Sequence, residues 1–264
     1  MSARTTSIRI APLHTLDDLQ TCVDLQISVW GYSETDVIPR KMFLLAGHIG
    51  GQVIGAIDDS QGGKLAGFAM ALPGYRDRRS YLHSHMLAVL PEYRNHGLGR
   101  RLKLAQRDEA LARGIQLMEW TFDPLEIKNA YLNLARLGAV TRRYQPDFYG
   151  PSSSPLQGGL PTDRLYAEWW LSSPRVQRYV ADEAIQTEAC QVVEEVLVPQ
   201  AIHEWKQDPA LHERALEVQR ANREALQSAF NRGLAVVDYR REDNGDGRFL
   251  LGILDPSEIE SSKS

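Results

Sequence analysis

Hydrophobic and polar residues repeat along the chain with two periods, which predicts strands and helices in succession. Residues 7–12 are expected to form a first strand and residues 17–30 a helix. In that helix four apolar residues recur at helical spacing: Leu19, Val23, Ile27 and Trp30. A second, short helix is expected after Pro39. Two-residue alternation then predicts strands over residues 52–57 and 64–72, joined by a polar hairpin turn.

The middle of the chain continues this order. A strand is expected over residues 81–90, then a helix from Leu98 that Gly114 stops. Its buried stripe is expected to contain Leu98, Leu102, Ala105 and Ala112. After a strand over residues 116–122, Asp123-Pro124-Leu125-Glu126 is typical of a helix start, because it combines a capping acceptor, a proline and a reciprocal glutamate.

The last third of the chain predicts further elements of both kinds. Residues 151–161 are rich in Pro, Ser and Gly and predict a loop, and residues 162–171 predict a strand covered on both faces. After Ser172-Ser173-Pro174 we expect, in order, a helix, a strand over residues 191–198, a long helix from Asp208-Pro209 and a hairpin around Asn244-Gly245. The fold class predicted is therefore α/β, with a mixed sheet between helices.

Composition and charge narrow the class of protein. The 264 residues are 43% hydrophobic without an apolar run near the length of a membrane span, and the formal net charge of -4 argues against general nucleic-acid binding. The N-terminal residues lack the apolar segment of a signal peptide. Cys22 and Cys190 make no disulfide framework, and each is expected to be a small buried hydrophobe. These features predict a globular cytoplasmic protein without nucleic-acid or membrane partners, and they leave a homodimer open.

The segment Leu-Ala-Val-Leu-Pro-Glu-Tyr-Arg-Asn-His-Gly-Leu-Gly-Arg-Arg-Leu, residues 87–102, joins an apolar strand to an amphipathic helix through a glycine-containing turn. A helix start leaves its first N–H groups unpaired and carries a partial positive charge, so Gly97 and Gly99 would let a phosphate approach closely. The Lys-Ser/Thr pair of a Walker A loop is missing, and Leu102 replaces the third glycine of a dinucleotide fingerprint. Four cations of this turn and the helix after it are further candidates to meet phosphate groups: Arg94, Arg100, Arg101 and Lys103. An ordinary glycine turn with a solvated basic helix start is the alternative.

Arg94-x-x-Gly97-x-Gly99, preceded by Leu-Ala-Val-x-Pro-Glu-Tyr, closely resembles the acyl-CoA signature of the GNAT superfamily of N-acyltransferases. In that family the turn holds the CoA pyrophosphate, and the end of the preceding strand pairs with the pantetheine arm. The resemblance implies acetyl-CoA or another acyl-CoA as cosubstrate and an amine as acceptor. By this resemblance the residues that hold the cosubstrate are Leu87, Ala88, Val89, Arg94, Asn95, His96, Gly97, Leu98, Gly99 and Arg100.

The resemblance also implies an architecture. Residues 1–171 are expected to form the GNAT-like core, a mixed and mostly antiparallel sheet flanked by helices. Residues 172–264 continue past what a minimal acyltransferase needs. We expect them to form a structural β-α-β-β extension that packs on the core, because the connection at Ser172-Ser173-Pro174 is too short for a free linker.

Transfer to an amine requires a base or a desolvating pocket, because an alkyl ammonium with a pKa near 10.4 is neutral in only about one molecule in a few thousand at pH 7. Known members often place this base on the strand before the turn, six residues before its last apolar residue. The resemblance therefore implies His83, counted back from Val89. His85 lies on the same side of the strand, and a purely structural histidine pair is the alternative. No third residue with metal-ligand spacing accompanies them, so no metal site is expected.

The departing thiolate needs a proton, which many GNAT members supply from a tyrosine four residues before the glycine that ends the second core helix. That glycine corresponds to Gly138, and the position holds Leu134, so this chain departs from the family pattern. Tyr131 lies one turn earlier and is expected to substitute. Asn129 and Asn133, also one turn apart, could bind pantetheine or acceptor, with solvent exposure as the alternative.

Other polar and aromatic residues have structural explanations. Asp123 is explained as a helix cap, and Trp120 and Phe122 as core residues.

Three functions compete: a CoA-dependent N-acetyltransferase or related N-acyltransferase for a small-molecule or peptide amine, a catalytically inactive acyl-CoA sensor on the same scaffold, and an unrelated nucleotide-binding oxidoreductase. The missing helix tyrosine makes the second a serious rival of the first, and Leu102 argues against the third.

Overall fold

The structure is a computed structural model that describes residues 7–181 and 191–259. The chain forms two compact units, residues 1–118 and 119–264. Residue 171, the predicted end of the acyltransferase core, lies inside the second unit. The division into a core and a C-terminal extension remains a prediction, and Cys190 lies outside the described residues.

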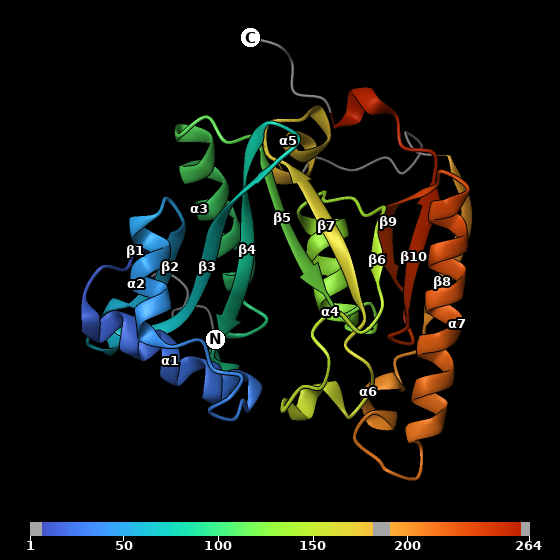
Figure 1. Ribbon diagram of the computed structural model, residues 1–264, viewed down its shortest axis with the longest axis horizontal. Coiled ribbons are helices and arrows are strands. Elements are labelled where there is room, and N and C mark those ends of the chain that lie inside the picture. Colours follow the sequence, from blue (N-terminus) through green and yellow to red (C-terminus); the bar gives the residue numbers. More distant parts are fainter. Residues whose placement is uncertain (1–6, 182–190, 260–264) are drawn as a thin grey trace. The chain divides into compact units, whose positions relative to one another are not determined.

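The first unit is an antiparallel sheet with helices on both faces (Figure 1). Its strands pair in the order β1-β2-β3-β4. The elements are β1 (Ile8–Pro12), α1 (Leu16–Trp30), α2 (Arg40–His48), β2 (Gln52–Asp58), β3 (Lys64–Arg76), β4 (Arg79–Val89) and α3 (Leu98–Ala112), with short 3-10 turns η1 (Asp59–Gln61) and η2 (Pro91–Tyr93). All the strands and helices predicted for this part of the chain are present, with ends shifted by a few residues.

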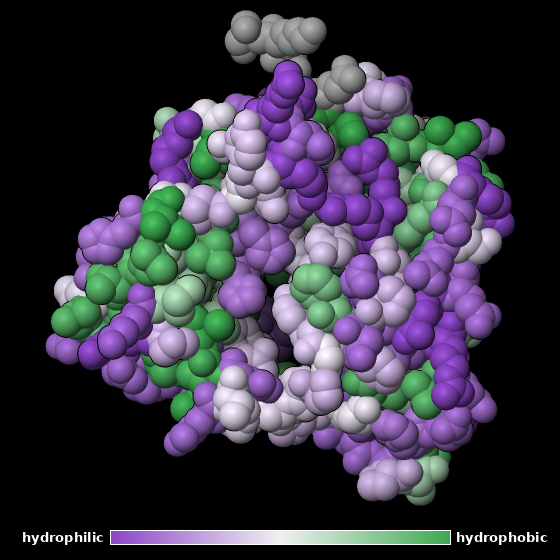
Figure 2. All heavy atoms as spheres, in the orientation of Figure 1, coloured by the Kyte–Doolittle hydropathy of each residue, from purple (hydrophilic) through white to green (hydrophobic). Residues whose placement is uncertain are grey.

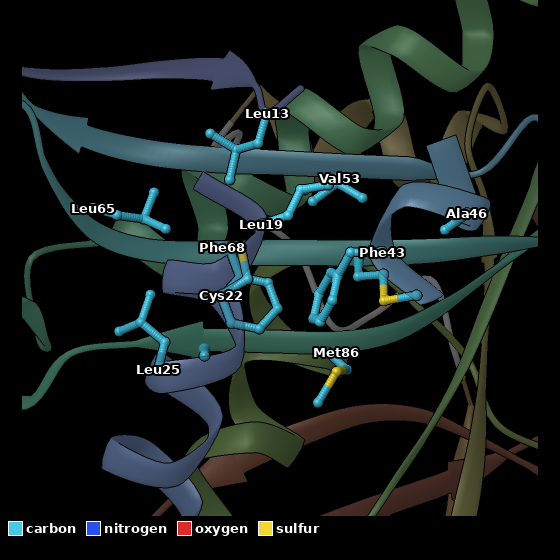
Figure 3. Packing of buried hydrophobic residues seen from close by; sticks show 12 residues of the cluster. Leu13, Leu19, Cys22, Leu25, Phe43, Ala46, Val53, Leu65, Phe68 and Met86 are labelled. Atoms are coloured by element: carbon cyan, nitrogen blue, oxygen red, sulfur yellow. The ribbon is translucent and has the colours of Figure 1, made fainter. Parts of the chain in front are cut away.

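Two apolar clusters hold the sheet to its helices. On one face Phe43 of α2 packs against Phe68 of β3 with a ring separation of 5.6 Å, and Cys22 of α1 lies beside them (Figure 3). The Cys22 thiol is fully buried, and this burial, together with the nearby Asp18, raises its pKa to about 12. On the other face Leu98 and Leu102 of α3 pack against the sheet. Cys22 is therefore the small buried hydrophobe that the sequence predicts.

Helix faces differ from the predicted stripes at several positions. Ile27 was expected in the core of α1 but is 51% exposed, while Cys22, Leu25 and Gln26 are buried. In α3 the polar Lys103 and Gln106 are buried, whereas Ala112 is exposed. Apolar side chains of α2 are also exposed, and apolar atoms gather over the region of α1 and α2 (Figure 2). Tertiary partners, rather than hydrophobicity alone, decide which positions are buried.

The second unit contains two sheets. Its elements are β5 (Leu117–Phe122), which begins at the end of the first unit, α4 (Ile127–Ala130), the π-helix η3 (Tyr131–Arg136), β6 (Tyr144–Gln145), η4 (Pro155–Gln157), β7 (Arg164–Trp170), α5 (Pro174–Val180), β8 (Val192–Val198), α6 (Ile202–Trp205), α7 (His212–Asn231), β9 (Ala235–Arg241), β10 (Gly247–Gly252) and η6 (Pro256–Glu258). The strand order is β5-β7-β6 in one sheet and β8-β10-β9 in the other, and β8-β10-β9 is antiparallel throughout.

Residues 140 and 141 connect these two sheets. Val140 forms an isolated bridge with Glu168 of β7, and Thr141 forms one with Val236 of β9. Thr141 N donates to Val236 O at 3.3 Å, and Val236 N donates back at 2.9 Å. Strands on either side of residue 171 are thereby joined by backbone hydrogen bonds. The whole is an α/β fold with a mixed, mostly antiparallel sheet flanked by helices, as predicted.

The second core helix begins later than the sequence predicts. Asp123 does not cap it; its Oδ1 accepts from Leu125 N at 2.8 Å and closes a turn, and α4 starts at Ile127. From Tyr131 the helix widens into a π-helix, which is rare and often found at functional sites. α7 likewise begins at His212 rather than at Asp208. No described helix is long and apolar enough to cross a membrane.

Candidate active site

The glycine turn after β4 has the backbone geometry of an anion cradle. Gly97 has a φ of 73° and caps α3, a conformation that favours glycine. The first helical hydrogen bond runs from Arg101 N to Gly97 O at 3.1 Å, so the amides of Leu98 and Gly99 lie in the first turn, whose N–H groups have no partner within the helix. A Cβ built on Gly97 meets no atom within 4 Å. The position of this Cβ therefore lies in open space.

Hydrogen bonds fix the start of this turn to the sheet. The Tyr93 hydroxyl donates to Asp58 Oδ2 at 2.9 Å, and Lys64 Nζ lies 2.9 Å from Glu92 Oε1. The Ser60 hydroxyl and, after it, the Tyr93 hydroxyl donate to the Asp58 carboxylate and lower its pKa to about 2. Asp58 therefore stays ionised near neutral pH and holds Tyr93. This anchoring keeps the position of the turn constant, as an anion site requires.

The cations around the turn do not all face it. The Arg94 Nε donates to Val89 O at 3.0 Å, and Arg101 Nη2 donates to Ile8 O at 2.6 Å. Lys103, which the sequence made a candidate for phosphate binding, is 3% exposed and donates to Ser84 Oγ at 2.7 Å. Burial lowers the pKa of Lys103 well below its usual value. Lys103 and Arg101 are thus structural, a correction to the predicted run of phosphate-binding cations.

β4 carries both histidines and the residues expected to meet pantetheine. Met70 of β3 pairs with Met86, but the next residue, Ala71, pairs with Ser84, so His85 is the extra residue of a β-bulge. The rings of His83 and His85 lie 6.1 Å apart at their centroids. Both side chains are half-buried, and burial lowers the pKa of His85. Bulges commonly re-aim side chains beside active sites.

Leu87, Ala88 and Val89 end the same strand. Ala88 is buried, while Leu87 and Val89 are half-buried and pack on the α3 side of the sheet. His83, these three residues and the turn from Arg94 to Arg100 are therefore carried by one continuous strand, turn and helix of the first unit. In the turn, Asn95 and His96 are exposed and Leu98 is a core residue.

The remaining predicted residues lie in the second unit, on α4 and η3. Asn129 is exposed, Asn133 is buried and Tyr131 is half-buried. Leu134, which occupies the family's tyrosine position, is fully buried in the core. The ring of Tyr131 has the Arg241 guanidinium 5.8 Å from its centroid. Tyr131 is thus the partly exposed hydroxyl-bearing residue of this helix.

Residues beside this helix have structural roles. Trp120 stacks edge-on against Trp169 at 5.9 Å, and Phe122 is buried, as expected of core residues. Lys206 Nζ lies 3.0 Å from both Asp123 Oδ2 and Glu126 Oε1. No sequence pattern indicates Lys206 or Arg241, because each contacts its partner across 80 or more residues. Within the described ranges no group of three His, Cys, Asp or Glu side chains could hold a metal ion.

The chain is similar to known acetyltransferases. Residues 20–133 match the model of the acetyltransferase (GNAT) family. No curated protein matches the sequence. Among solved structures, Arabidopsis thaliana NAA60 in complex with a bisubstrate analogue is 15% identical with a TM-score of 0.50, over 62% of this chain and 98% of that chain. The same protein in complex with acetyl-CoA also has a TM-score of 0.50.

A provisionally assigned acetyltransferase from Acinetobacter baylyi ADP1 is 17% identical with a TM-score of 0.51, over 66% of this chain and 97% of that chain. At these identities the likeness concerns the fold. Each of these structures leaves about a third of this chain unmatched.

Proposed function

Because this chain belongs to the GNAT superfamily and is an acyl-CoA-dependent acyltransferase, we propose that it is an N-acetyltransferase that transfers an acetyl group from acetyl-CoA to an amine of a small molecule or peptide. The observation that carries this proposal is the turn from Arg94 to Arg100, with Gly97 in the left-handed conformation at the start of α3. The family membership excludes the nucleotide-binding oxidoreductase. Leu134 at the tyrosine position is the argument for the inactive sensor, and the comparisons do not support that alternative.

The acetyl group is the part of the proposal that the neighbours support. Arabidopsis thaliana NAA60 has been solved with acetyl-CoA, and residues 20–133 match a family named for acetyl transfer. We propose that the amides of the turn hold the pyrophosphate of acetyl-CoA and that the backbone of Leu87 to Val89 pairs with pantetheine. Asn129, which is exposed on α4, is proposed as a further contact to the cosubstrate.

The proposed chemistry moves protons at two residues. His83 accepts a proton from the acceptor ammonium, and the neutral amine then attacks the thioester carbonyl. When the tetrahedral intermediate collapses, the carbon–sulfur bond breaks, Tyr131 gives its proton to the departing thiolate, and the new amide nitrogen returns its surplus proton to the Tyr131 phenolate. A neutral imidazole can accept this first proton from the ammonium. Each proton transfer is assigned to one residue, so a single substitution at His83 or Tyr131 tests it.

Substitution of Gly97 tests the cosubstrate site. Gly97→Glu places a negative side chain where phosphate would bind, so calorimetry should show acetyl-CoA affinity reduced by at least about 100-fold, the scale of a few lost charge-assisted contacts. Gly114→Glu is the matched control, because Gly114 follows the other end of α3, has a φ of 77° and also faces open space. Equal acetyl-CoA affinity in the Gly97 variant and the Gly114 variant would refute the assignment.

A further inference from the structure

The second unit contains a pocket with a volume of about 580 Å³. Tyr131 of η3 forms part of its wall, and β8, β9 and β10 supply the rest. Its lining includes Val192, Glu195, Asp238, Arg241 and Leu250. Pockets of 300–1,000 Å³ are typical of small-molecule sites. The strands that follow residue 171 therefore build a cavity around the residue proposed as the catalytic acid.

Most of the charges at this pocket neutralise one another. Arg240 Nη2 lies 3.2 Å from Glu195 Oε1, and its Nε lies 3.1 Å from Glu242 Oε1. Arg248 pairs with the same two carboxylates, at 3.5 Å from Glu195 Oε2 and 2.8 Å from Glu242 Oε1. Two guanidinium groups and two carboxylates thus form a closed network with no net charge.

The Asp238 carboxylate accepts hydrogen bonds from protein groups. Its Oδ1 accepts from Tyr239 N at 2.8 Å, and Tyr179 of α5 also donates to its carboxylate. The positive charge of Arg175 acts on the same carboxylate. Burial nevertheless raises the pKa of Asp238. Its hydrogen-bonding capacity is therefore directed largely toward protein groups.

Of the two arginines that line the pocket, Arg240 is paired with carboxylates and Arg241 with none in the described part of the chain. The Arg241 side chain is exposed, and its guanidinium lies over the Tyr131 ring, within the distance of a cation–π contact. Across residues 7–181 and 191–259 it makes no ion pair with a carboxylate. The planar N–H fork of a guanidinium without a carboxylate partner matches the two oxygens of a carboxylate.

We propose that this pocket binds the carboxylate of the acceptor through Arg241, so that the preferred acceptors are amino acids or similar amines with a neighbouring carboxylate. This inference rests on the proposed function. In an α-amino acid the amine and the carboxylate share one carbon atom, so a carboxylate held on Arg241 places the amine beside Tyr131. An amine without a carboxylate gains no such positioning. The strands after residue 171 thereby determine acceptor specificity.

Ligand-observed NMR on the full chain tests the site without turnover. The probes are a mixture of the standard amino acids and the matching mixture of their carboxamides. We expect the acids to bind and the carboxamides to bind at least about tenfold more weakly, the effect of about 1.4 kcal/mol. Arg241→Gln should abolish the preference, and Arg241→Lys should restore part of it. Arg220→Gln is the control, because Arg220 is an exposed residue of α7 that pairs with Glu213 at 3.2 Å.

Several outcomes would refute the proposed carboxylate site at Arg241. Equal binding of acids and carboxamides, a preference that survives Arg241→Gln, or no acid binding up to about 10 mM would each do so. Thiol release from acetyl-CoA with a plain alkylamine separates this inference from the proposed function. Equal release for alkylamine and acids would leave an N-acetyltransferase without the carboxylate site. Acid binding through Arg241 without thiol release would overturn the acceptor role and the proposed function together.

Discussion

Lys206 Nζ lies 3.0 Å from Asp123 Oδ2 and joins α6 to the loop that precedes the helix of Asn129 and Tyr131. The Lys206 side chain is 2% exposed. Burial alone would lower the pKa of Lys206, but Asp123 and Glu126 outweigh it and raise the pKa. The ammonium therefore stays charged, and the loop is held from a residue more than 80 positions later in the chain.

Lys206→Met should destabilise the protein by about 3 kcal/mol, because removing one partner of a buried ion pair leaves uncompensated carboxylates. Urea unfolding followed by circular dichroism measures this loss. Lys128→Met is the control, since Lys128 is exposed on α4 and should change stability by less than about 0.5 kcal/mol. A similar small loss for Lys206→Met would show that the buried pair has no net stabilising effect.

His83→Ala should lower turnover by about 100-fold or more with little change in acetyl-CoA affinity, since general-base contributions are of that size. The acidic limb of the pH–rate profile should disappear with it. His14→Ala, at an exposed position after β1, should leave both unchanged. If the acidic limb persists in His83→Ala, His83 is not the general base and its role is structural.

Tyr131→Phe should reduce turnover by about 10- to 100-fold while acetyl-CoA binding remains, because it removes a proton donor and little packing area. Tyr75→Phe is the matched control, since Tyr75 is 73% exposed on the hairpin of β3 and β4. Steady-state thiol release compares the variants. Full activity in Tyr131→Phe would mean that water protonates the thiolate or that it leaves unprotonated.

His85 should make the protein less stable as the pH falls. Because burial lowers the pKa of His85 in the folded state, the unfolded chain binds a proton more readily once the pH drops below its ordinary pKa near 6.5. Stability is therefore full above that pH and declines from there toward the lower, folded-state pKa. His85→Gln should flatten this decline in urea titrations between about pH 7.5 and 5.5. Identical slopes for the two proteins would exclude His85 as a source.

Removing residues 172–264 should prevent the rest of the chain from folding stably. Asp163 is fully buried, and its two carboxylate oxygens each lie 2.8 Å from the Arg223 guanidinium of α7. Arg175 Nε also donates to Gly138 O at 2.9 Å. Excision would leave a buried carboxylate without its cation and Thr141 without the backbone hydrogen bonds that it forms with Val236.

Thermal melting and sedimentation of a fragment ending at Leu171 measure the effect, and aggregation or a much lower melting temperature is expected. Arg223→Met in the full chain keeps the prediction testable if the fragment does not express, and it should cost about 3 kcal/mol. A soluble fragment that melts like the full chain and retains acetyl transfer would show instead that residues 172–264 are an independent domain.

The sequence by itself determined the local features of this protein. Two-residue alternation predicted the strands of the first unit, and Gly97 with the amphipathic segment after it predicted a glycine turn at a helix start. These succeed because strand pairing between neighbours, helix capping and glycine conformation depend on residues close in the chain. The Leu98 and Leu102 stripe of α3 was correct for the same reason.

Only the tertiary structure decided which polar side chains are buried and where some helices begin, because these features depend on partners distant in the chain. Periodicity could not show that Lys103 and Gln106 are buried, because the Ser84 hydroxyl that bonds both lies on β4. The late start of α4 has a related cause, since Lys206 and Leu125 N use the Asp123 carboxylate that the sequence assigned to a cap. A carboxylate bonds to the donors that the fold brings near, and Lys206 is 83 residues away in the sequence, beyond the reach of a local pattern.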